Sequence, residues 1–225
     1  MYVGCGSAAT VDSINCTKHR IRAIIARSRV PEDPRHAENT LEWLLRLKPD
    51  ADEALQIAAL GHDIDRAIEG RKVQRADFTD YDAFKAAHAR NSALVLKEIM
   101  EACDVAPDIE EQVYRLVCRH EVGGDPHAEL LKDADGISYF DVNLPLYYER
   151  SGWEETKRRC VWGYRRLSAR IRQVVENMSY ENQELNALLK EAISEASALA
   201  VPSGHSPTGE PSSLDVPSTA SPGRP

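Results

Sequence analysis

The chain has 225 residues, of which 42% are hydrophobic and 28% are charged, with a formal net charge of −8. This length and apolar content predict one globular domain with a single core. The acidic balance excludes a general attraction to nucleic acid or to anionic membranes, so a phosphorylated ligand would need a local cluster of Arg and Lys. No apolar run is long enough to cross a bilayer and no signal peptide is recognisable, so we expect a cytoplasmic protein.

The cysteines give no sign of a disulfide framework or a zinc ribbon. Their number is odd, and none of them forms a Cys-x-x-Cys pair. We therefore expect reduced thiols. The cysteines are Cys5, Cys16, Cys103, Cys118 and Cys160.

Composition divides the chain into three parts. Residues 1–12 are small and aperiodic, and we expect them to be flexible. Residues 13–199 form the predicted helical domain, with its core motif over 36–135 and C-terminal helices over 153–199. Residues 200–225 are rich in Pro, Ser and Gly, so we expect a disordered tail, in which His205 is a poor candidate ligand.

The domain is predicted to be all-α, because apolar residues recur at spacings of three and four and strand-like alternation is absent. Pro34 suits the first turn of one helix, and Asp50 or Asp52 suits the N-cap of the next. Helices are expected over residues 13–27, 34–48, 52–65, 79–102, 107–121, from 125 onward, 153–177 and 181–198. The last helix packs across the bundle or against a second copy of the chain, so a homodimer stays open.

Histidine and aspartate recur on the apolar faces of these predicted helices. The residues are His36, His62, Asp63, His88, His120 and Asp135. A single histidine on such a face is more often a hydrogen-bonded core residue, and arginines could satisfy the two aspartates. Neither alternative explains the whole set, because a buried carboxylate is costly unless it is paired or coordinated. The pattern therefore indicates nitrogen and oxygen ligands for a divalent metal.

The order of these residues resembles the HD superfamily of metal-dependent phosphohydrolases, whose motif is a His, a later His-Asp doublet and a final Asp. His36 matches the first position, "LGHDID" supplies the doublet, and Asp135 in "LLKDADGIS" matches the last position. The resemblance covers roughly residues 19–141. It implies a helical bundle of the HD type with additional C-terminal helices.

His88 in "AAHARNS" and His120 in "CRHEVGG" match positions found in the binuclear branches of that superfamily. The resemblance implies one or two ions of Fe, Mn, Co, Ni, Zn or Mg, with Asp63 as the bridge and His88 and His120 on the second ion. The order is similar to that of HD-type symmetrical diadenosine tetraphosphate hydrolases. Cyclic dinucleotide phosphodiesterases of the HD-GYP type fit less well, because the paired His and the Gly-Tyr-Pro signature are missing after His120.

This resemblance implies hydrolysis of a phosphoester or phosphoanhydride bond, in a nucleotide or dinucleotide, by metal-activated water. Asp63 and Asp65 are the predicted catalytic carboxylates, with Asp65 accepting or orienting the proton of the water. A solvated helix end is the alternative for Asp65. A diiron oxygenase, a dehydratase and a non-catalytic metal-binding or nucleotide-binding regulator also stay open.

Basic residues after the doublet are expected to hold the phosphate, since guanidinium groups bind phosphate oxygens bidentately. A solvated surface role is the alternative for each of them. An aromatic segment over 137–153 is expected either to shape the substrate pocket or to pack in the core. The predicted substrate-binding residues are Arg66, Arg71, Lys72, Arg75, Arg90, Tyr147 and Arg158.

Overall fold

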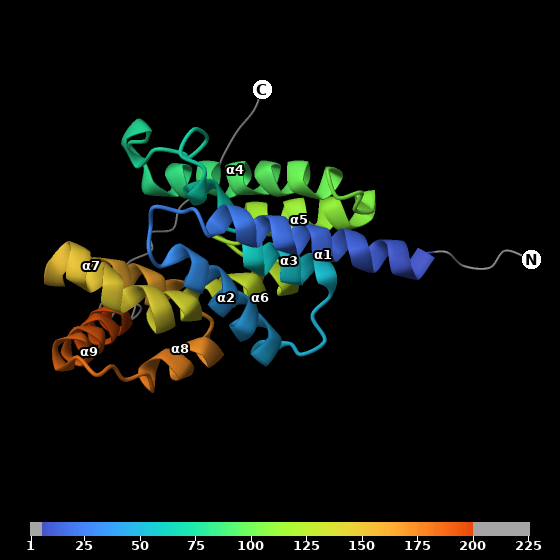
Figure 1. The fold of residues 1–225 in the computed structure, drawn as a ribbon. Helices are drawn as coiled ribbons and strands as arrows, with labels where there is room; N and C mark the ends of the chain where they lie inside the picture. Colours follow the sequence, from blue (N-terminus) through green and yellow to red (C-terminus); the bar gives the residue numbers. More distant parts are fainter. Residues whose placement is uncertain (1–5, 200–225) are drawn as a thin grey trace, which may run out of the picture.

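The computed structural model describes residues 6–199 and is all-α, as predicted, with no strand in that range. The helices are α1 (Gly6–Ile25), α2 (Asp33–Leu47), α3 (Glu53–Gly61), α4 (Tyr81–Glu101), α5 (Pro107–Arg119), α6 (Pro126–Ser138), α7 (Leu144–Arg166), α8 (Ala169–Glu176) and α9 (Gln183–Ala198) (Figure 1). Short 3₁₀ helices η1 (Ile64–Ala67) and η2 (Arg75–Asp77) lie between α3 and α4. Residues 1–5 and 200–225, including His205, lie outside the described residues.

The sequence explains where several helices begin. Asp52, Asp80 and Asp125 each precede a helix, and each side chain accepts hydrogen bonds from backbone N–H groups of the first turn. Helices α2, α5 and α6 each carry a proline in their first turn, where no backbone donor is needed. These caps fix the start of the helices that carry the predicted ligands.

Some boundaries differ from the predictions. Helix α1 begins at Gly6, so residues 6–12 are helical. The third helix ends at Gly61 and continues as η1 instead of as a regular helix. The single helix expected over 153–177 is broken at Leu167, whose backbone is extended. Apolar spacing did not reveal this break, because Tyr164 before it, Leu167 at it and Ile171 after it are all buried.

Helices α6 and α7 form an almost continuous rod, joined by a π-helical turn at Tyr139–Asn143. Gly152 interrupts α7 with a φ of 73° and a ψ of −177°, a conformation that glycine adopts without steric cost. The rod therefore bends in α7, and both Tyr147 before the bend and Arg159 after it line the same cavity.

Two hydrophobic clusters form the core. The first draws on α1 to α6, and the second on α6 to α9, with Trp43 and Leu47 of α2 packed against both. Helix α4 packs on α5, α2 on α6, α3 on α5 and α7 on α9 (Figure 1). The side chains of Leu55 and Ile57 in α3 are fully buried. Helix α3 thus carries its C-terminal end, and the His-Asp doublet, into the interior.

Cys16 in α1 and Cys103 after α4 form a disulfide, which corrects the expectation of reduced thiols. The two residues are 87 positions apart, so only the packing of α1 beside α4 brings them together. Cys118 and Cys160 are free thiols among the described residues. Cys5 lies outside the described range.

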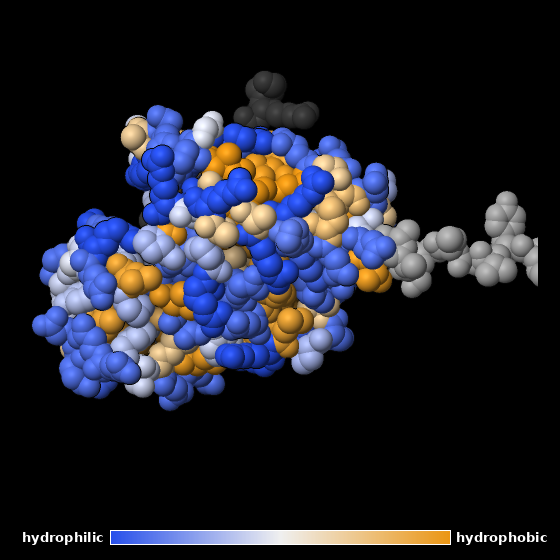
Figure 2. All heavy atoms as spheres, in the orientation of Figure 1, coloured by the Kyte–Doolittle hydropathy of each residue, from blue (hydrophilic) through white to orange (hydrophobic). Residues whose placement is uncertain are grey.

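The face drawn in Figure 2 is mainly hydrophilic, with hydrophobic patches separated by charged and polar side chains. Among residues 6–199, no helix is both long and apolar enough to cross a membrane.

Candidate metal centre

Six buried or nearly buried side chains from five helices and their ends meet in the interior. They are His36 on α2, His62 and Asp63 at the end of α3, His88 on α4, His120 at the end of α5, and Asp135 on α6. They form two groups, and within each group the ligand atoms all lie within 4.8 Å of one another. The structure thus brings together every residue predicted as a ligand, in groups that could hold a metal ion.

The first group consists of His36, His62 and Asp135. The Nε2 atoms of the two histidines are 3.2 Å apart. The Oδ1 atom of Asp135 lies 3.3 Å from Nε2 of His36 and 3.4 Å from Nε2 of His62. Three ligand atoms therefore point at one small volume.

Asp63 stands between this group and the second one. Its Oδ1 atom is 2.7 Å from Nε2 of His88 and 3.9 Å from Nε2 of His120. The same oxygen is 3.9 Å from Nε2 of His62, and Oδ2 is 3.9 Å from Nε2 of His36. The carboxylate thus faces histidines of both groups, as a bridging ligand must.

The backbone fixes which nitrogen two of these imidazoles present to the centre. Nδ1 of His62 donates to the carbonyl of Ala59 at 2.9 Å, and Nδ1 of His120 donates to the carbonyl of Val117 at 2.7 Å. Both histidines follow the last turn of a helix, where carbonyl groups lack an intrahelical partner. Their Nε2 lone pairs are consequently left for the centre.

Side chains orient the other two imidazoles. The hydroxyl of Ser138 donates to the carbonyl of His36 at 3.2 Å, so its oxygen is free to accept from Nδ1 of His36 at 2.9 Å. Nδ1 of His88 lies 2.7 Å from Oδ1 of Asp65. All four histidines therefore direct Nε2 at the centre, the arrangement found in metal sites with outer-shell hydrogen bonds.

Asp65 lies behind His88, on the side away from the centre. Its Oδ2 atom accepts hydrogen bonds from Asn91 at 3.2 Å and from the backbone N–H of Val73 at 3.4 Å. The side chain is buried, which contradicts the alternative of a solvated helix end. This position suits the orientation of His88 better than proton transfer from a water at the centre, so we expect a positioning role for Asp65 in place of the predicted catalytic role.

We expect Asp65→Ala to weaken metal binding by the group of Asp63, His88 and His120 by roughly 10–100-fold, the usual effect of losing an outer-shell partner. Asp65→Asn keeps an oxygen that can accept from Nδ1 of His88 and should lose less. Anaerobic titration with Mn²⁺ measures both affinities, with melting temperatures as a check on folding. Unchanged binding of both ions in a folded Asp65→Ala protein would contradict this role.

The donor atoms present fit a metal ion. Nε2 of His120 is buried without a hydrogen-bond partner, although it lies 3.2 Å from Oε1 of Glu121. Since Nδ1 of His120 donates to Val117, the Nε2 atom offers a lone pair toward carboxylate oxygens, and a cation would satisfy these buried acceptors. Imidazole nitrogens combined with carboxylates are typical ligands of divalent transition metals.

Charges in the centre strongly shift the pKa values of Asp63, His62 and His88. Burial alone would raise the pKa of Asp63, but His62, His88 and Arg66 hold it well below its usual range. Burial likewise opposes ionisation of His62 and of His88, but the nearby carboxylates, Asp63 with Asp135 at His62 and Asp63 with Asp65 at His88, together outweigh it and raise the pKa of each histidine to about 9. In metal-free protein at neutral pH these two imidazoles carry protons, which compete with a metal.

This competition predicts a pH dependence. Both folded-state pKa values, about 9, lie above the ordinary value of 6.5, so the ion pairs stabilise metal-free protein fully below about pH 6.5 and are lost as the pH rises through about 9. We expect its melting temperature to fall over this window. Metal-loaded protein holds deprotonated imidazoles throughout, so its fall should be smaller. Calorimetry on both forms tests this, and a metal-free protein that is equally or more stable at pH 9 would contradict it.

Two buried carboxylates beside the centre were not predicted from the sequence. Asp33 lies 3.0 Å from Nη2 of Arg66, whose Nη1 is 2.7 Å from Oδ2 of Asp63. Arg66 therefore connects Asp33 to the bridging carboxylate and holds it in place. Glu121 pairs with Lys85 and, at 2.7 Å, with Arg166. No local pattern marks either acid, because its partners are distant in the sequence.

A cavity of about 680 Å³ opens beside the centre, and His88 forms part of its wall. Five of the predicted substrate-binding residues line it: Arg66, Lys72, Arg75, Tyr147 and Arg158. The sequence analysis missed five lining residues that extend the basic and aromatic wall: Tyr81, Phe84, Lys85, Arg159 and Trp162.

Two predicted substrate-binding residues lie elsewhere, which corrects their assignment. Arg71 forms an exposed ion pair with Glu98 at 2.5 Å. Arg90 is on the exposed face of α4, where a hydrogen bond with Tyr114 raises its pKa. Neither lines the cavity. Both arginines thus have the solvated surface role that was the alternative for them. Glu98 contacts Arg71 and Tyr114 contacts Arg90, in each case outside the site.

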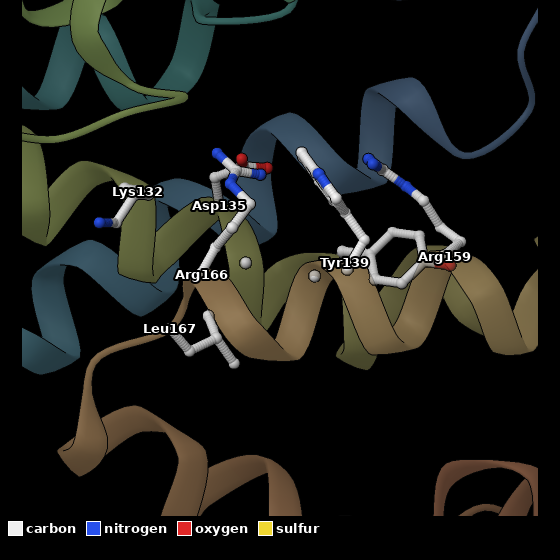
Figure 3. Close-up of a pocket in the computed structure, with 9 residues that line it drawn as sticks. Lys132, Asp135, Tyr139, Arg159, Arg166 and Leu167 are labelled. Carbon is white, nitrogen blue, oxygen red and sulfur yellow. The ribbon is translucent and has the colours of Figure 1, made fainter. Parts of the chain in front are cut away.

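A small pocket of about 20 Å³ connects the centre to the C-terminal helices. Asp135, Tyr139, Arg159 and Arg166 border it, and Figure 3 shows their side chains together between α6 and α7. Arg159 lines this pocket and the larger cavity. Helix α7 therefore covers the metal centre from the side of Asp135.

No curated protein and no solved structure matches the chain. One family model, described as "Domain of unknown function (DUF4202)", matches residues 8–189, which include the whole metal centre and the cavity. The chain belongs to this family.

Proposed function

We propose that the protein is a metal-dependent phosphohydrolase of the HD type that cleaves a phosphoester or phosphoanhydride bond, with a nucleotide-like compound as substrate. One observation carries the proposal: two adjacent ligand groups, with Asp63 facing histidines of both, lie beside a cavity that is lined by His88 and by several basic side chains. The order of the ligands along the chain, which resembles the HD superfamily, supports the same conclusion.

His36, His62 and Asp135 would hold one ion, His88 and His120 the other, and Asp63 would bridge them. Four imidazole nitrogens favour Fe, Mn, Co, Ni or Zn over Mg²⁺, which prefers an all-oxygen shell. Such ions lower the pKa of water and neutralise phosphoryl oxygens.

The residues of the chain supply binding and orientation. Arg66 holds Asp63 from one side. Lys85, fixed by its ion pair with Glu121, lines the cavity beside His88 and can bind a phosphoryl oxygen there. Arg159 joins the cavity to the pocket beside Asp135, so it can neutralise charge at both places. These cations would hold a phosphate beside the metal ligands. The leaving group of the substrate would then lie in the open part of the cavity.

A test uses metal-free protein reloaded anaerobically with Mn²⁺, Fe²⁺, Co²⁺ or Ni²⁺ and assayed against nucleoside mono-, di- and triphosphates and dinucleotides. Release of phosphate or nucleotide should require metal and disappear in Asp63→Ala. Arg71→Gln, which changes a charge outside the cavity, serves as the control and should retain turnover. Absence of metal-dependent hydrolysis with every reloaded form would overturn the proposal.

The same ligands would suit a diiron oxygenase, and a regulator could bind metal without turnover. The basic cavity favours the hydrolase, because an oxygenase of a neutral substrate has no need for several cations beside its metals. Oxygen uptake by iron-loaded protein, measured with the same substrates, separates the oxygenase from the hydrolase. Nucleotide binding without phosphate release or oxygen uptake would identify the regulator.

A further inference from the structure

Guanidinium groups of the protein already lie over the aromatic rings beside the cavity. The guanidinium of Arg159 lies over the ring of Trp162 at 4.4 Å, and that of Arg166 lies over the same ring at 4.2 Å. Arg159 precedes Trp162 by three residues and Arg166 follows it by four, so the two arginines approach the ring from opposite directions along α7. The ring of Trp162 therefore already contacts two cations of the protein itself.

The same arrangement recurs on the wall that the start of α4 and the segment before it form. Arg75 lies over the rings of Tyr81 at 5.7 Å and Phe84 at 5.9 Å. Phe84 also stacks on His88, with ring centroids 6.3 Å apart. These rings support cations and a metal ligand, and they offer a nucleobase little open surface.

Tyr81 connects the two walls. Its hydroxyl accepts a hydrogen bond of 2.8 Å from Nη1 of Arg159, while its ring lies under Arg75. Its ring also meets the edge of Trp162, at 5.4 Å and 88°. The contacting rings of Tyr81 and Trp162 thus hold both Arg75 and Arg159 at the wall of the same cavity. Cation–π contacts of this kind hold a guanidinium in place while leaving its donors available.

The cations of the cavity wall differ in whether a carboxylate of the protein already balances their charge. Arg66, Lys85 and Arg158 each pair with a carboxylate. In the described part of the chain, Lys72, Arg75 and Arg159 have no ion pair with a carboxylate. Like charges gathered on one cavity repel each other, and an anion with several charged groups would relieve this. A single phosphate could not contact cations spread over both walls as fully as a chain of phosphates.

We propose that the cavity binds its substrate through a chain of two or more phosphate groups, held by Arg75 and Arg159 on their aromatic supports together with Lys72, with little contribution from base stacking. This rests on the proposed function and names its substrate class: an inorganic or organic polyphosphate whose phosphoanhydride bond lies at the metal centre.

Calorimetric titration of the metal-free, full-length protein tests this without relying on turnover. The probes are inorganic triphosphate, inorganic phosphate and adenosine. We expect triphosphate to bind at least about tenfold more tightly than phosphate, and adenosine to show no binding, since each charge-assisted hydrogen bond contributes more than a neutral one. Comparable binding of adenosine and triphosphate would overturn the proposal.

Variants assign the binding to these side chains. Arg159→Gln and Arg75→Gln should each weaken triphosphate binding by about tenfold, and Arg159→Lys, which keeps the charge but loses the stacked plane, should lie between Arg159→Gln and the wild type. Arg71→Gln is the matched control and should stay within about twofold, because Arg71 is paired outside the cavity. Wild-type affinity in Arg159→Gln would contradict the assignment.

The outcome is separable from that of the proposed function. If triphosphate binds as expected but no metal-loaded form hydrolyses a phosphoanhydride, the phosphate site stands and the enzyme proposal fails. If metal-dependent hydrolysis occurs but turnover depends strongly on the base and not on the number of phosphates, the enzyme proposal stands and the polyphosphate site fails.

Discussion

Asp63→Ala is expected to abolish binding of both metal ions and with it all metal-dependent activity. The reason is that this carboxylate faces histidines of both ligand groups, so its loss removes a ligand from each. Arg66 would also lose one of its two carboxylate partners and keep only Asp33 to balance its charge beside the centre. The decrease should exceed the roughly 10–100-fold effect expected for an outer-shell partner such as Asp65.

Metal content of the purified variant, measured together with turnover, checks this expectation. Asp12→Ala, which removes an exposed carboxylate from α1, is the control for the change in charge. His62→Ala should resemble Asp63→Ala in activity. Full metal occupancy and turnover in a folded Asp63→Ala protein would show that the ligand assignment is wrong.

Removal of residues 169–225 is expected to abolish cooperative folding. Helices α8 and α9 contribute large apolar side chains to the second core cluster, among them Ile171, Val175, Leu185, Leu188 and Leu189. Burial of each such side chain stabilises a protein by about 1.5–3 kcal/mol. Their combined loss is comparable to the whole stability of a typical domain, about 5–15 kcal/mol.

Removal of residues 201–225 alone should change melting and turnover little, because this Pro/Ser/Gly-rich segment has few apolar residues to bury. Thermal melting of both truncated proteins provides the comparison. A cooperative transition within a few degrees of the wild type after removal of 169–225 would contradict the role of the second cluster. Loss of activity in a folded protein that lacks 201–225 would make His205 a residue to reconsider.

The ligands were predictable because helical periodicity carries the needed information. His36, His62, His88 and His120 lie on apolar faces whose register follows from the spacing of their neighbours, and all four are buried together. The hydrogen-bond partners of these histidines were harder to predict from the sequence. Ser138 is 102 residues from His36, and no local rule connects the two.

The substrate-binding residues were only partly predictable, for two physical reasons. The connection between α3 and α4 has no long regular period, so the directions of Arg66 and Arg71 depend on partners such as Asp33 and Glu98. In α7 the bend at Gly152 changes which face meets the cavity, and Arg159 reaches it in addition to the predicted Arg158. The disulfide escaped prediction because tertiary packing alone brings its cysteines together.

We expect Asp63 to join two metal sites. Anaerobic titration of metal-free protein with Fe²⁺ or Mn²⁺, followed by calorimetry, measures the number of ions bound per chain. We expect two in the wild type and one in His88→Ala or His120→Ala, because these histidines belong only to the second group. Saturation of the wild type at one ion would contradict the bridging role of Asp63 and leave His88 and His120 as groups that orient or contact the phosphate.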